Sequence, residues 1–316
     1  MKKYILLVVG VAILTAAGCG GSNRNSQKTI TVTGAFALYP LMVKWVDEFK
    51  AEHPDVSIDV SAGGAGKGMT DVLANMSDIA MVSREVYPQE KEKGAMAFAV
   101  AKDAVVAIVN AENPLIKDII AKGISNENAK KIWISESIKS WGDLLGNGNK
   151  TQMNVYTRSD ACGAAETWAG WFGTKQEDLA GVQVFGDPGI VAAVQNDKFA
   201  IGYANIGYAY DAGNKLPNKN IVVLPIDIDG NGKIDASENF CSTKDQVVTA
   251  IETGVYPSPP ARDLYLVTNG KPQNPNVVKF IRYILKDGQK ENIPAGYVGM
   301  SSESISESLK RLRKGK

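Results

Sequence analysis

Hydrophobic residues follow two different periods in the first hundred residues, and the two periods alternate along the chain. Short runs of β-branched and apolar residues predict strands. Between them, apolar residues recur three or four positions apart, which predicts helices with one buried face. Such alternation is typical of an α/β sheet. The predicted strands are 29–33, 56–60, 79–82 and 104–109, and the predicted helices begin at Pro40 and close to Met69.

The second half of the chain continues this pattern and adds two crossing points, at 110–114 and at the proline-rich run 256–260. A chain that crosses twice between lobes places a cleft at the hinge, where ligands usually bind. We therefore expect an α/β fold of two lobes, each a mixed sheet flanked by helices. The first lobe would comprise 28–109 and 256–316, and the second 110–255. Further predicted elements are strands at 154–156, 200–204 and 263–268, an apolar segment at 132–145 and a helix at 275–285.

The first residues are typical of a targeting segment. Two lysines precede an apolar stretch at 4–17, which is shorter than the roughly 20 residues of a membrane span and suits a secretory signal. The small residues before Cys19 resemble the lipobox of bacterial lipoproteins, with Ala16 where leucine is usual. We expect a signal peptide at 1–18, lipidation at Cys19, a flexible tether at 19–27 and an extracytoplasmic protein anchored to a membrane. An ordinary cleaved signal with a chance cysteine is the alternative.

The charges of the chain nearly cancel, since 35 lysines and arginines face 34 acidic residues and leave a net charge of +1. The chain has no broad basic field of the kind that attracts a nucleic-acid backbone. Any preference for anions must therefore be local. Beyond Cys19 only Cys162 and Cys241 remain, and a disulfide between them stays open in an oxidising compartment.

Three predicted strands are each followed by small residues that lead into a helix, at 34–37, 63–68 and 161–164. The first N–H groups of a helix have no internal partner and lie at the positive end of its dipole. Small side chains allow an oxyanion to approach these groups, so three converging helix starts would form an anion cage. The segment 63–68 does not fit the P-loop or GxGxxG patterns, and a plain glycine turn is the alternative there.

Two arginines would add side chains to this cage. The planar guanidinium of Arg158 can hold two oxygens at once, and Asp160 could orient it or accept a proton from a protonated oxyanion. Ser83 and Arg84 end the strand 79–82 and would supply a hydroxyl and a second cation. The alternative for Arg158 and Asp160 is a surface ion pair, which contributes little.

Several segments in the same order resemble the periplasmic phosphate-binding protein family, the substrate-capturing lipoproteins of bacterial phosphate ABC transporters. The resemblance implies a type 2 periplasmic-binding-protein fold, capture of inorganic phosphate in the cleft, delivery to membrane permease subunits, a monomer and no enzymatic activity. The segments are GAFALYPLMVKW (34–45), SAGGAGKGM (61–69), DIAMVSRE (78–85), RSDACGAAETW (158–168), AIGYANIGY (200–208) and YPSPPARDLYLVT (256–268).

The family commonly has hydroxyl side chains where this chain has Ala35, Ala65, Cys162 and Ala164, and some members have a ligand-contacting aspartate at the position of Arg84. Main-chain amides would therefore carry more of the binding here, and another tetrahedral oxyanion such as sulfate, arsenate, molybdate or tungstate remains open. The Cys162 side chain either occupies the position of the family's serine as a small buried residue, or its thiol donates a weak hydrogen bond to the ligand. The expected phosphate-binding residues are Phe36, Ala37, Ala65, Gly66, Ser83, Arg84, Arg158, Asp160, Cys162, Gly163 and Ala164.

The segment 227–238, DIDGNGKIDASE, fits the EF-hand calcium loop at each key position. Gly232 stands at the turn and Ile234 at the usual apolar position. Because the preceding segment 221–225 resembles a strand, we expect an isolated structural Ca²⁺ loop inserted in the second lobe, and no organic cofactor. A solvated acidic turn is the alternative. The expected ligands are Asp227, Asp229, Asn231, the Lys233 carbonyl, Asp235 and Glu238.

The sequence fits two other classes of protein, a hydrolase and a non-transport surface lipoprotein, less well than a binding protein. A hydrolase would need a nucleophile and a base, yet the sole histidine, His53, lies in a helix-ending turn and Cys162 has no evident histidine partner. A metal-dependent phosphatase would need clustered His and Asp residues. A non-transport surface lipoprotein would not require three small-residue helix starts with two arginines.

Overall fold

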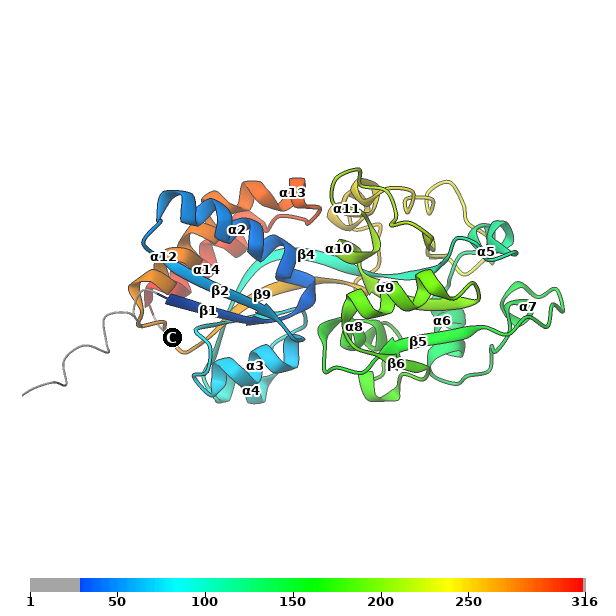
Figure 1. Ribbon diagram of the computed structural model, residues 1–316, viewed down its shortest axis with the longest axis horizontal. Coiled ribbons are helices and arrows are strands. Elements are labelled where there is room, and N and C mark those ends of the chain that lie inside the picture. Colours follow the sequence, from blue (N-terminus) through cyan, green and yellow to red (C-terminus); the bar gives the residue numbers. More distant parts are fainter. Residues whose placement is uncertain (1–28, 315–316) are drawn as a thin grey trace, which may run out of the picture.

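The computed structural model describes residues 29–314. The predicted signal peptide, tether and lipidation site at Cys19 lie outside these residues. Apolar side chains gather into two separate cores. The parts of the chain that form them lie side by side along the molecule (Figure 1). One core takes its residues from 30–101 and 264–312, and the other from 104–261 together with Val298. The parts built around them are called the first lobe and the second lobe below.

The first lobe is a mixed sheet with helices packed on its two faces (Figure 1). β1 pairs in parallel with β2 and β3, whereas β9 runs antiparallel to both β3 and β4. Its elements are β1 (Thr29–Gly34), η1 (Phe36–Leu38), α2 (Tyr39–Glu52), β2 (Ser57–Ala62), α3 (Ala65–Leu73), β3 (Ile79–Val82), α4 (Pro88–Glu92), the first part of β4 (Ala95–Asn110), β9 (Ala261–Asn269), α12 (Pro275–Leu285), η3 (Asp287–Glu291), α13 (Asn292–Ala295) and α14 (Ser302–Lys314).

The second lobe continues the same sheet in the order β4, β7, β5, β6, with β8 also paired to β4. β5 is parallel to β6 and β7, and β4 is antiparallel to β7 and β8. Its elements are α5 (Ile116–Lys122), α6 (Asn126–Trp133), α7 (Trp141–Leu145), β5 (Asn154–Arg158), α8 (Gly163–Trp171), η2 (Gln176–Asp178), β6 (Val182–Val184), α9 (Gly186–Asn196), β7 (Ala200–Asn205), α10 (Ile206–Ala209), β8 (Ile221–Val223) and α11 (Lys244–Glu252).

The chain passes between the lobes within β4 and at the start of β9. Residues 95–104 of β4 pair with β9, and residues 105–109 pair with β7. The expected crossings at 110–114 and 256–260 lie on the second-lobe side of these points. The strand predicted at 104–109 is the second half of β4. Its first half was not predicted, because the alanine-rich segment 95–101 is apolar on both faces and lacks an alternating pattern.

The other predicted elements fall close to observed ones. The helix predicted at 275–285 is α12, which begins with Pro275 behind the capping side chain of Asn274. The apolar segment 132–145 spans the end of α6 and the whole of α7. Among the helices of the described part of the chain, none combines the length and the apolar character that crossing a membrane requires.

Candidate functional site

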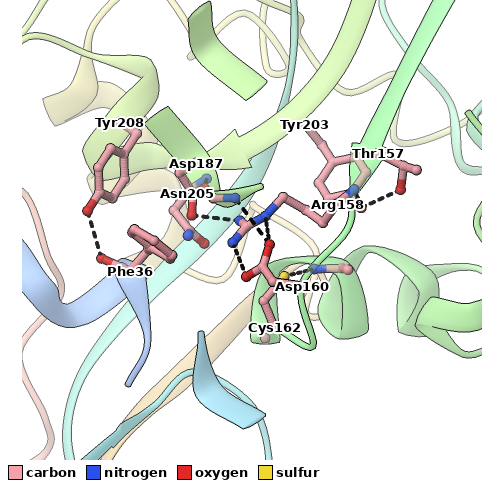
Figure 2. Close-up of polar contacts among 12 residues, drawn as sticks. Phe36, Thr157, Arg158, Asp160, Cys162, Asp187, Tyr203, Asn205 and Tyr208 are labelled. Atoms are coloured by element: carbon pink, nitrogen blue, oxygen red, sulfur yellow. Dashed lines mark hydrogen bonds and ion pairs between the residues drawn. The ribbon is translucent and has the colours of Figure 1, made fainter. Parts of the chain in front are cut away.

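Arg158 ends β5, and α8 begins five residues later at Gly163, so the arginine and the helix start lie together where the second lobe faces the first (Figure 2). The first lobe approaches closely here. A Cβ atom added to Gly163 would overlap the carbonyl and hydroxyl oxygens of Ser83, which follows β3. The carboxyl ends of β3 and β5, from different lobes, therefore meet at one point.

Two carboxylates hold the guanidinium of Arg158. Nε and Nη2 donate to Asp160 at 2.8 and 2.7 Å, and Nη1 donates to Asp187 at 2.7 Å. The arginine side chain is only 1% exposed. Burial opposes its charge, but Asp187 and Asp160 outweigh burial and raise the pKa of Arg158 above its ordinary value. A guanidinium has five N–H groups, so two remain for a further acceptor.

The start of α8 supplies further donors. The amides of Gly163 and Ala164 donate to no acceptor within residues 29–314, and they lie at the positive end of the helix dipole. Cys162 is the N-cap, and its sulfur accepts from the amide of Ala165 at 3.4 Å. Burial raises the pKa of Cys162 to about 12, so the group remains a thiol at neutral pH. Capping does not use the thiol hydrogen.

The first lobe contributes two more helix starts. The amides of Phe36 and Ala37 in η1 and of Ala65 in α3 have no acceptor in the described part of the chain. The phenyl ring of Phe36 reaches into the second lobe, 5.5 Å from the Arg158 guanidinium and edge-on to Phe185 and Tyr208. The hydroxyl of Tyr208 donates to the Phe36 carbonyl at 3.2 Å (Figure 2).

Two expected ligand residues are engaged elsewhere in this structure. Arg84 turns to its own lobe, where it donates to both carboxylate oxygens of Glu90 at 2.9 and 2.7 Å and lies over the ring of Tyr87. It therefore does not join Arg158. The amide of Gly66 donates to the carbonyl of Ala161 at 3.1 Å, a hydrogen bond between the lobes. The two lobes are therefore in direct contact at this point.

The description of a PBP superfamily domain fits this chain over residues 21–288. The chain belongs to the PBP superfamily. The phosphate-binding protein PstS of Staphylococcus haemolyticus is 26% identical over 99% of this chain and 98% of its own length. The PstS protein of Bacillus subtilis is 29% identical over 66% of this chain and 72% of its own. The family resemblance noted from the sequence is thereby confirmed.

Solved structures support the same PBP fold. A structure described as a phosphate ABC transporter substrate-binding protein with bound phosphate, from Clostridium perfringens, has a TM-score of 0.70 at 23% identity and covers 86% of this chain and 100% of its own. An ABC-type phosphate transport receptor from Vibrio cholerae has a TM-score of 0.61 at 19% identity, with 86% and 100% covered. The predicted α/β architecture is confirmed.

Several residues around Arg158 and Gly163 were not predicted as site residues. Asp187 at the start of α9 and Tyr203 on β7 both hold Arg158, since the Tyr203 hydroxyl accepts from the Arg158 amide at 3.2 Å. Arg262 on β9 lies 3.2 Å from Asp103 on β4 and donates to the carbonyl of Gly163. The sequence offered one signal, the Asp-Pro-Gly opening of α9 after a strand. The tertiary contacts themselves have no local signature.

Burial raises the pKa of Asp103 to about 7, partly offset by the nearby Arg262. Asp103 lies at the point where β4 passes from the first lobe to the second, so a buried titratable group sits at the hinge of this PBP fold.

The cysteines and the histidine of residues 29–314 lie in separate places. Cys162 and Cys241 are both buried free thiols in the structure. His53 ends α2, where it packs edge-on against Phe49 and contacts Lys279 at the surface. Neither cysteine has a hydrogen bond to a histidine anywhere in the part of the chain described.

The predicted calcium loop brings three of its acids together. Asp227, Asp229 and Glu238 place ligand atoms within 4.8 Å of one another. The side-chain amide of Asn231 donates to Asp229 and Asp235, and Lys233 forms an ion pair with Asp235 at 3.0 Å. Three predicted ligands thus converge, and the others surround them in the loop.

Proposed function

We propose that this protein captures inorganic phosphate outside the cytoplasm and delivers it to the membrane permease of an ABC transporter. The observation that carries the proposal is the Arg158 guanidinium, which keeps two unused N–H groups beside the free amides of Gly163 and Ala164. A tetrahedral oxyanion presents oxygens in several directions, and donors from a guanidinium and a helix start suit it. The phosphate-binding names of the relatives support the same ligand.

Closure of the lobes would complete the site. Ser83 comes from the first lobe and faces Gly163 in the second, so its hydroxyl can reach an anion at the α8 start only when the lobes approach. The free amides of Phe36, Ala37 and Ala65 also come from the first lobe. Binding would begin on the second lobe, where Arg158 is already positioned, and the first lobe would then exclude water. The hydrogen bond from Gly66 to Ala161 must open to admit the ligand.

The charges around Arg158 favour an oxyanion that carries a proton. Asp160 and Asp187 give this cluster one more negative than positive charge. A fully deprotonated anion would face these carboxylates without a proton to share, whereas the O–H group of a phosphate can donate to a carboxylate oxygen. Sulfate carries no such proton at neutral pH. We infer that phosphate and its close analogue arsenate are preferred over sulfate and molybdate.

We further propose that the mature protein is a monomer held at a membrane through lipid on Cys19 and has no catalytic activity. The extracytoplasmic setting follows from the apolar segment at 4–17 and the cysteine behind it. A monomer suffices because both halves of the candidate site come from one chain. Mass spectrometry of the protein from membranes tests the anchor, and incubation with phosphate esters, which should release no phosphate, tests the absence of catalysis.

Calorimetric titration of dialysed protein with phosphate, arsenate, sulfate and molybdate tests the ligand. We expect saturable binding of phosphate at one site. Arg158→Lys should weaken it on the order of 100-fold, because lysine cannot reproduce the forked donors. Arg84→Lys is the matched control, since Arg84 is held by Glu90 and should leave affinity nearly unchanged. Tighter binding of sulfate or molybdate would reassign the ligand, and absence of binding to all four would refute the proposal.

A further inference from the structure

The segment between β8 and α11 gathers acidic side chains far from the interlobe site. Asp227 and Glu238, eleven positions apart, approach each other together with Asp229, with ligand atoms of all three within 4.8 Å. The loop is folded so that its first and last acids meet. Carboxylate oxygens at this separation repel one another unless a cation lies between them.

Burial makes this repulsion costly. Asp227 is 3% exposed and Glu238 is 4% exposed. Within residues 29–314, neither of them nor Asp229 forms an ion pair with a lysine or arginine. Lys233, the nearest basic residue in the loop, is paired with Asp235 instead. The Lys122 ammonium lies beside Gly232 but forms no ion pair with the three acids. Buried ionised carboxylates require a counter-charge, and no described lysine or arginine supplies one by direct pairing.

One carboxylate oxygen of the cluster lacks a hydrogen-bond partner. Oδ1 of Asp227 is buried and has no hydrogen-bond partner among the described residues, whereas Oδ2 accepts from the Gly232 amide at 3.0 Å. A buried acceptor without a donor is rare in folded proteins. It lies in a cluster of three acids, where a metal ion would satisfy it.

The backbone of the loop is arranged for a bound ion. Gly230 and Gly232 have φ of +73° and +83°, a left-handed conformation that bends the chain around its centre. Glu238 folds back and accepts from the amides of Ile228 at 2.7 Å and Asp235 at 3.0 Å. These hydrogen bonds hold the last acid beside the first.

We propose that residues 227–238 bind one Ca²⁺ ion. The ligands would be Asp227, Asp229 and Glu238, with Asn231, Asp235 and the Lys233 carbonyl at the remaining oxygen positions. An all-oxygen set at loop positions 1, 3, 5, 7, 9 and 12 suits a large hard cation with flexible coordination, which favours Ca²⁺ over Mg²⁺. The inference is independent of what binds between the lobes.

The ion would stabilise the second lobe rather than act as a switch. The Ile234 amide donates to Ala121, and its side chain packs where a Cβ on Gly123 would lie, so the loop is docked on the end of α5. β8 ends at Val223 and α11 begins at Lys244, which leaves the loop without the paired helices that open in calcium sensors. Ca²⁺ would therefore fix the path from β8 into α11.

Titration of chelator-treated wild-type protein with Ca²⁺ or Mg²⁺ tests the proposal by calorimetry and thermal unfolding. We expect one saturable Ca²⁺ site and a rise of about 5 °C in Tm once Ca²⁺ exceeds its Kd by about 100-fold. Mg²⁺ should bind at least about tenfold more weakly. Both measurements use the intact protein without any oxyanion, so the result is separable from the phosphate proposal.

Asp227→Asn and Glu238→Gln should each abolish the Ca²⁺-dependent rise in Tm. Asp211→Asn is the matched control, because Asp211 also folds an exposed loop of the second lobe, through hydrogen bonds from the amides of Gly213 and Asn214, but lies outside the cluster. This variant should keep the full response. If a cluster variant does not fold, the wild-type calorimetric titration alone decides. Absence of saturable Ca²⁺ binding by the wild-type protein, or an equal response of D227N and D211N, would overturn the site.

Discussion

Arg158 and Asp187 form an ion pair of 2.7 Å whose two side chains are 1% and 0% exposed. The other oxygen of Asp187 accepts from the Asn205 amide at 2.8 Å, so the pair links the end of β5 to the end of β7 through the first turn of α9. Asp160 holds the opposite edge of the same guanidinium. The arginine is therefore oriented without a ligand, and Asp187 serves as its buried counter-charge.

Replacing Asp187 with asparagine should lower the stability of the ligand-free protein by about 3 kcal/mol, because it removes one of the two buried carboxylates that hold Arg158 and leaves Asp160 as the only charged partner of the arginine. An incoming phosphate would restore part of that negative charge. The rise in Tm on adding phosphate should therefore be larger for D187N than for the wild type. Thermal unfolding with and without phosphate measures both effects.

Asp197→Asn provides the control for this comparison. Asp197 is also in the second lobe and accepts hydrogen bonds from Asn154 and Tyr156, but it does not touch Arg158. D197N should show the phosphate response of the wild type. A phosphate response in D187N that is smaller than in the wild type would show that Asp187 supports the anion directly rather than balancing the arginine.

Gly163 is the position at which the two lobes come closest. An alanine there would overlap the main chain and the hydroxyl of Ser83, so closure would be blocked while the second lobe stayed folded. We expect Gly163→Ala to weaken phosphate binding more than about tenfold, since the closing lobe supplies donors worth at least 1.4 kcal/mol. Small-angle scattering should show no compaction when phosphate is added.

Gly170→Ala is the matched substitution in the same helix. No atom lies within 4 Å of the position its Cβ would take, and alanine stabilises a helix interior by up to about 1 kcal/mol relative to glycine. G170A should therefore bind phosphate as the wild type does, with an equal or higher Tm. Weak phosphate binding by G170A would show that the effect of G163A comes from a change in α8 itself rather than from the blocked contact with Ser83.

The elements around the site could be predicted where the signal is local. The start of α8 was predicted from small residues after a strand, and α12 from Pro275 with its cap at Asn274. In each case the deciding interactions lie within a few residues of one another. The same holds for the loop at 227–238, whose glycines fix its turns.

The direction of the charged side chains could not be predicted in the same way. Arg84 was expected in the cage because it ends a strand beside Ser83, but Glu90 six residues later provides a bidentate partner in the same lobe. Asp187 reaches Arg158 across 29 positions of sequence. The acid with which an arginine pairs depends on how distant segments pack against each other. That packing cannot be deduced from a single sequence.

Tyr87 and Glu166 form a hydrogen bond of 2.7 Å between the start of α4 and the first turns of α8, so it joins the two lobes. Tyr87→Phe removes it without changing the ring. Because a net hydrogen bond contributes about 1 kcal/mol, phosphate affinity should fall about fivefold. The loss should appear mainly as faster release, which stopped-flow displacement of phosphate measures.

Tyr265→Phe tests whether that loss belongs to the lobe contact. The Tyr265 hydroxyl donates to Glu85 at 2.8 Å, and both residues lie in the first lobe. Y265F removes a hydrogen bond of similar length and should leave the release rate unchanged. Equal release rates in Y87F and the wild type would mean that this contact does not keep the lobes closed.

Asp103 at the hinge should make stability depend on pH. Burial raises its pKa to about 7, only partly offset by Arg262, against about 3.9 in an unfolded chain. The contribution of Asp103 to the free energy of unfolding is therefore fully present below pH 4, and it is lost as the pH rises through 7. Asp103→Asn lacks this loss, so its free energy of unfolding relative to the wild type should rise by about 2–3 kcal/mol between pH 5 and pH 8. Urea unfolding across that range measures the difference.

Asp263→Asn, which breaks the exposed pair with Lys102 on the same two strands, should show no such trend. A pH-independent difference for D103N would mean that Arg262 keeps Asp103 ionised throughout.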